Sequence, residues 1–91
     1  MNKTEAKSLL GNGLHALAGR SFGKLVAMIG HADVKNIQGT SGANYQIELN
    51  VFWDSKPEGD LRIIGSIDDG GWRAFVPLTE SLIIKRDGKL V

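Results

Sequence analysis

The chain has 91 residues, which is enough for one small domain. Its charge is balanced, with 11 Lys and Arg against 10 Asp and Glu, so it offers no electrostatic footprint for nucleic acid or for an anionic membrane. It contains no Cys, which excludes disulfides and thiolate metal sites and favours a cytoplasmic location.

Residues 1–19 are predicted to be a short helix or a poorly ordered segment. Thr4–Leu10 can form a helix, but Gly11-Asn12-Gly13 interrupts it, and isolated helices of that length are marginal. The segment lacks the unbroken apolar stretch of a signal peptide, and nothing in the chain approaches the length of a membrane span. Residues 20–91 are expected to form a single α+β domain.

Ser21–Gly30 is predicted to be the main helix. Ser21 is a suitable N-cap, and Gly30 is a natural C-terminal stop. Between them, Phe22, Leu25 and Met28 recur at helical spacing. This apolar stripe is wide enough to lie on a sheet.

Two strands are predicted to follow this helix. Asp33–Gly39 is the first, and a turn at residues 40–44 ends it. Tyr45–Asp54 alternates strictly between apolar and mainly polar side chains, which is typical of a half-buried strand. Its core face is predicted to carry Tyr45, Ile47, Leu49, Val51 and Trp53.

Leu61–Pro77 is predicted to form a tight β-hairpin. Asp69-Gly70 lies between two apolar runs, and this dipeptide suits a two-residue turn. That turn would place Gly65 opposite Ala74 on the core face, leaving a dent that Trp72 or a closely approaching helix could fill.

The alternation of Tyr45–Asp54 pairs this strand with the hairpin in one register, with Leu49 beside Gly65. Because two independent patterns agree, the sequence predicts an antiparallel meander. Ser81–Lys85 is expected to add a short strand. The predicted fold is α+β, with one main helix packed on an antiparallel sheet of four or five strands.

The combination of VFWD with IDDGG and RAFVPL, together with the later RDG, resembles a family of small bacterial proteins. The similarity covers about residues 20–91. It implies a helix that opens with Ser before an aromatic residue, here Ser21-Phe22, followed by a sheet. The resemblance implies no activity, no cofactor and no catalytic residue.

Asp68 and Asp69, with Glu48 on the neighbouring strand, could supply oxygen ligands to Mg²⁺. A tight turn already explains an Asp that precedes Gly, and this interpretation is favoured. We therefore expect no metal and no cofactor. His15 and His31 lack the ligand spacing of a zinc site.

Arg62 and Arg73 are predicted to share the outer face of the sheet with Glu48. Such charges most commonly form an exposed cross-strand pair, but two guanidinium groups can also bind an anion. Glu48, Arg62 and Arg73 are therefore the candidate ligand-binding residues. No Ser has the context of an activated nucleophile, so no catalytic residue is expected.

Phe52, Ile64 and Phe75 are three large apolar side chains predicted on that same outer face. Adjacent apolar groups there need a cover. It could come from the segments around Leu9-Leu10 or Leu82–Ile84, or from a second subunit or a partner protein. The favoured interpretation is a non-enzymatic protein-interaction module that self-associates as a homodimer through these residues. The alternative is a small hydrolase or an anionic-ligand-binding protein that uses Glu48, Arg73 and Asp68.

Overall fold

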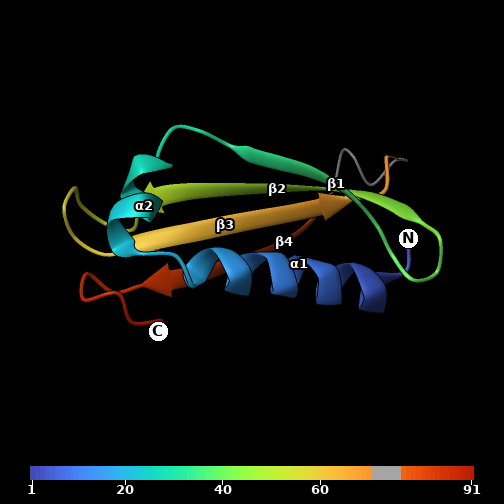
Figure 1. Cartoon of the computed structure of the whole chain (residues 1–91), viewed down its shortest axis with the longest axis horizontal. Helices are drawn as coiled ribbons and strands as arrows, with labels where there is room; N and C mark the ends of the chain where they lie inside the picture. The colour runs from blue at the N-terminus through green and yellow to red at the C-terminus, as the bar shows by residue number, and fades with distance from the viewer. Residues whose placement is uncertain (71–76) are drawn as a thin grey trace.

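Two helices precede four strands in the computed structural model, which describes residues 1–70 and 77–91. The elements are α1 (Lys3–Ala18), α2 (Phe22–Ala27), β1 (Asp33–Gln38), β2 (Asn44–Trp53), β3 (Leu61–Asp68) and β4 (Leu78–Ile84). The strands form one antiparallel sheet in the order β1-β2-β3-β4, and α1 runs along one side of it (Figure 1). The predicted α+β meander with one main helix is confirmed.

The main helix is α1, and the prediction that Ser21–Gly30 holds this place is wrong. The Asn2 side chain caps α1 by accepting a hydrogen bond from the amide of Glu5 at 3.0 Å. Buried side chains then recur every three or four residues along one face: Ala6, Leu10, Leu14 and Leu17. Burial of this stripe outweighs the cost of about 1 kcal/mol that each Gly brings to a helix interior.

The second helix, α2, has only six residues. Ser21 caps it as predicted, through a hydrogen bond from the Lys24 amide to its Oγ atom at 3.3 Å. Leu25 is its one fully buried side chain. The chain leaves the helix after Ala27 and turns at Gly30, whose φ of 86° suits glycine.

The predicted pairing of β2 with β3 is confirmed along its full length. Leu49 lies opposite Gly65, Val51 opposite Ile63 and Phe52 opposite Arg62. Burial alternates without a break along β3, and Arg62 stays off the core face. The core face of these strands therefore holds the apolar side chains, as the alternation required.

The predicted hairpin register after β3 is wrong. The strand that pairs with β3 is β4, which places Gly65 opposite Glu80 and Ile63 opposite Leu82. β4 starts earlier than the short strand predicted at Ser81–Lys85. The predicted strand Trp72–Val76 falls on residues 71–76, which lie outside the described residues.

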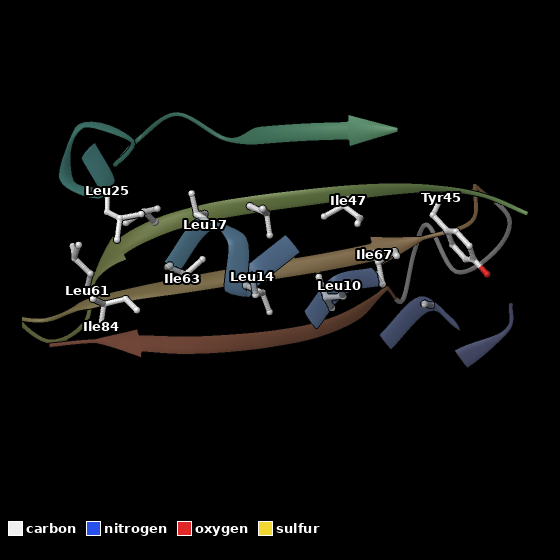
Figure 2. Close-up of a cluster of buried hydrophobic side chains, with 13 residues drawn as sticks. Leu10, Leu14, Leu17, Leu25, Tyr45, Ile47, Leu61, Ile63, Ile67 and Ile84 are labelled. Atoms are coloured by element: carbon white, nitrogen blue, oxygen red, sulfur yellow. The ribbon is translucent and has the colours of Figure 1, made fainter. Parts of the chain in front are cut away.

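One apolar core fills the space between α1, α2 and the sheet (Figure 2). Gly65 lies beneath the middle of α1, where a Cβ atom would come within 2.8 Å of Leu10 and 3.1 Å of Leu14. The helix therefore approaches the sheet closely at this glycine, which was one of the two predicted ways of filling the dent. No residue of β1 belongs to this core.

Candidate functional site

The face of the sheet turned away from α1 is the outer face. It carries the side chains that alternate with the buried ones of β2 and β3, and their partners in β1 and β4. These are Val34, Asn36, Gln38, Asn44, Gln46, Glu48, Asn50, Phe52, Arg62, Ile64, Ser66, Asp68, Thr79, Ser81 and Ile83. Both helices pack on the opposite side, so no described helix covers the outer face.

One end of the outer face is apolar. Phe52 lies on β2 with 46% of its surface exposed, although β2 is an interior strand of the sheet. Ile83 lies in the same cross-strand row as Phe52, with Arg62 between them, and Ile64 lies diagonally across from Phe52 on β3. Both isoleucines are half-buried. We call Phe52, Ile64 and Ile83 the apolar cluster.

The segments that could have covered this cluster from within the chain pack elsewhere. Leu10 and Ile84 are buried in the core on the opposite side of the sheet, and Leu9 and Leu82 pack against that core. Ile83 alone turns to the outer face and joins the cluster. Phe75, the third apolar residue predicted here, lies outside the described residues.

The candidate ligand-binding residues Glu48 and Arg62 lie apart on the outer face. Glu48 is opposite Ser66 and accepts a hydrogen bond from Asn50 at 3.2 Å. Arg62 donates from Nε to Asp54 at 2.9 Å and from a terminal nitrogen to Ser81 at 3.2 Å. Arg73 lies outside the described residues. Within the part of the chain that the structure describes, these charges are therefore held by neighbours and do not converge on a ligand.

Asp68 has the turn role that the sequence indicated. Its carboxylate accepts a hydrogen bond from the amide of Gly70 at 2.9 Å, and Gly70 has a φ of 80°. Asp69 lies 3.6 Å from the amino group of Met1. No group of three or more His, Cys, Asp or Glu side chains within residues 1–70 and 77–91 could hold a metal ion.

The polar end of the sheet borders an open groove of about 620 Å³. The residues that line it include Asn36, Gln38, Tyr45, Gln46, Asp68 and Asp69. Amide, hydroxyl and carboxylate groups can all hydrogen-bond to a polar ligand. Both carboxylates already have partners in the fold, since Asp68 accepts from the Gly70 amide and Asp69 lies near the amino group of Met1.

The most perturbed titratable group in the described chain is Glu5, in the first turn of α1. Its carboxylate accepts hydrogen bonds from Ser41 Oγ at 2.7 Å, Ser41 N at 3.0 Å, Tyr45 Oη at 2.8 Å and Thr40 Oγ1 at 3.2 Å. The Ser41 and Tyr45 bonds hold the pKa of Glu5 at about 2, against an ordinary value of 4.5. The same carboxylate raises the pKa of the Tyr45 hydroxyl.

This arrangement ties the start of α1 to the turn between β1 and β2. A Cβ atom at Gly39 would overlap the Glu5 carboxylate, so a side chain at this position would displace that carboxylate. No local sequence pattern signals this contact, since Glu5 and Ser41 are 36 positions apart. All four donors are neutral groups of the fold itself, so we interpret the cluster as structural.

The Glu5 contact makes stability depend on pH in a defined range. The folded-state pKa is depressed, so the stabilisation is complete above about pH 4.5 and is lost as the pH falls towards 2. We expect the thermal midpoint of the wild type to fall across this range by more than that of Glu5→Gln, which does not titrate. Equal pH slopes in calorimetry of the two proteins would contradict the assignment.

No known family model matches the chain, and no curated protein or solved structure shows significant similarity to it. Among the described helices, none is both long and apolar enough to cross a membrane.

Proposed function

We propose that this chain is a non-enzymatic protein-interaction module and that its outer face binds a second copy of the chain. The observation that carries the proposal is the apolar cluster on β2, β3 and β4, in which Phe52 is 46% exposed and both isoleucines are half-buried. Large apolar side chains that lie together on a surface are typical of protein–protein contacts.

The arrangement of the cluster fits a contact surface. Arg62 lies at its centre, where its ion pair with Asp54 and its hydrogen bond to Ser81 fix the guanidinium group. Aromatic and Arg side chains are enriched at the centres of protein interfaces, with polar residues around them. Here Asn50, Ser81 and Ser66 surround the apolar side chains.

A second copy is the simplest partner because the same surface then serves both subunits through a two-fold axis. Full burial of a Phe side chain is worth about 1.5–3 kcal/mol, and close to half of Phe52 is still exposed. Ile64 and Ile83 would add to this gain. The resemblance to small bacterial proteins and the lack of Cys favour a bacterial, cytoplasmic setting for the association.

The test is sedimentation equilibrium of the wild type and Phe52→Asp. Phe52→Asp removes the apolar side chain and puts a carboxylate, which must lose its water to be buried, at the centre of the contact. The association should weaken by roughly tenfold or more, which shifts the average mass towards the 9.8 kDa of one chain. Thr4→Asp is the control: it adds the same charge to an exposed position in the first turn of α1, where a carboxylate is tolerated. An unchanged mass for folded Phe52→Asp would refute the proposed contact.

A further inference from the structure

The strand β1 is the least protected part of the sheet. Every residue of β1 after Asp33 is exposed, including Val34 at 50% and Ile37 at 38%. The main helix packs on β2, β3 and β4, and β1 pairs only with β2 among the described residues. The opposite edge differs, because Leu90 pairs with Ile84 and the amide of Val91 donates to the carbonyl of Ile83 at 2.9 Å.

The backbone pattern shows which groups of β1 face away from β2. The amide of Gly39 donates to the carbonyl of Ala43 at 2.8 Å, so residues 39 and 43 form a hydrogen-bonded pair. Such pairs alternate along an antiparallel ladder, which directs the backbone groups of Lys35 and Ile37 towards β2. The N–H and C=O groups of Val34, Asn36 and Gln38 therefore point to the outer edge.

We propose that β1 pairs with β1 of a second copy, in the antiparallel register that places Asn36 opposite Asn36 of the other copy. A two-fold axis perpendicular to the sheet passes between these two residues and joins two four-stranded sheets into one. Val34 then lies opposite Gln38 of the other copy. All three outward residues find partners, which gives about six backbone hydrogen bonds.

Shifting one strand by two residues in either direction gives an alternative register. One shift pairs Val34 with Asn36 and places Lys35 directly opposite its own copy, where like charges are destabilising. The opposite shift pairs Asn36 with Gln38 and leaves Val34 without a partner in β1, so about two of the backbone hydrogen bonds are lost. In the proposed register Lys35 instead lies opposite Ile37. The aliphatic stem of Lys35 can cover that exposed side chain while the ammonium group reaches water.

This inference goes beyond the contact on the outer face and does not depend on it. The face contact uses an axis in the plane of the sheet, whereas edge pairing uses an axis perpendicular to it. Each contact leaves the other surface accessible. An experiment can therefore refute the face contact and leave edge pairing standing, or the reverse.

A cysteine scan of β1 tests the register, because the chain contains no native Cys. Hydrogen-bonded antiparallel partners lie about 5.5 Å apart between Cα atoms, within reach of a disulfide. Under diamide oxidation at tens of micromolar, Asn36→Cys should form a covalent dimer about tenfold or more faster than Val34→Cys or Gln38→Cys alone, since pairing raises the effective thiol concentration. A mixture of Val34→Cys and Gln38→Cys chains should crosslink to each other.

Two further results decide the proposal. Crosslinking of Asn36→Cys should persist when Phe52→Asp is added, which separates edge pairing from the face contact. Asn36→Pro, which removes the central amide hydrogen from an edge strand, should lower the mass of the assembly while leaving the chain folded. Equal, slow crosslinking at all three positions, or no effect of Asn36→Pro, would overturn edge pairing and would leave β1 as a site for another partner or for none.

Discussion

Leu14→Ala should lower the free energy of unfolding by about 3 kcal/mol, since replacing a fully buried Leu by Ala typically costs 2–5 kcal/mol. Leu14 is 1% exposed and contacts the sheet above Gly65. The loss should be large because α1 is the layer that closes the core. Circular dichroism recorded during urea unfolding measures this loss as a lower urea midpoint.

His15→Ala is the matched control, because His15 is exposed on the same turn of α1. Alanine is the better helix former, so this variant should unfold at the same urea concentration as the wild type or slightly above it. If Leu14→Ala and His15→Ala had equal midpoints, α1 would not be packed on the sheet as described.

Gly65→Val should lower the free energy of unfolding by about 2 kcal/mol, as overpacking a close-packed core usually costs 1–3 kcal/mol. The Cβ atom alone would come within 2.8 Å of Leu10, 2.9 Å of Leu49 and 3.1 Å of Leu14. Leu10, Leu14 and Leu49 are each buried to 99% or more, so they have little room to move. The preference of Val for strands offsets only part of this cost.

Gly11→Ala, in the helix that covers Gly65, should have the opposite effect on stability. A Cβ atom at Gly11 meets nothing within 4 Å, so Ala there should raise stability by up to about 1 kcal/mol. Denaturation midpoints of both variants beside the wild type test the close approach of α1 to β3. An equal or higher midpoint for Gly65→Val would show that the helix does not lie over that glycine.

The pairing of β2 with β3 could be predicted from burial and strand length together. One face of each strand is apolar, and a shift by one residue would bring Arg62 onto the core face. A shift by two residues would keep the faces but would leave the ends of the two strands unpaired. The same argument predicted that Phe52 and Ile64 lie on the outer face.

The main helix could not be predicted because its local and tertiary signals disagree. Gly11 and Gly13 weaken the helix, and the sequence shows them beside residues that could form a turn. What stabilises α1 is the burial of Leu10 and Leu14 against a sheet that the chain forms about 30 or more residues later. That contribution does not appear in any short stretch of sequence.

The partner of β3 was mistaken for a related reason. Trp72–Val76 and Leu78–Ile84 are both apolar enough to pair with β3, and Asp69-Gly70 favoured the nearer one. The entropic cost of closing a loop grows only slowly with its length. The apolar surface that each segment can bury therefore decides which of them pairs with β3. Leu82 and Ile84 lie opposite Ile63 and Leu61, which places two apolar pairs on the core face.

The candidate site was predictable in part. Alternation placed Phe52, Glu48 and Arg62 on one face, but it could not show that Arg62 is held by Asp54 and Ser81. Ile83 joined the apolar cluster only once the register of β4 was known. Its signal was present in Leu82-Ile83-Ile84, where only alternate side chains can enter the core.

The central claim, that uncovered surfaces of this sheet join copies of the chain, is tested most directly by sedimentation equilibrium of the wild type beside the double variant Phe52→Asp/Asn36→Pro. The account predicts a wild-type mass above one chain at tens of micromolar, and a folded double variant at 9.8 kDa. A wild type that remains at 9.8 kDa at the highest concentration, or a double variant with the mass of an associated wild type, would contradict it.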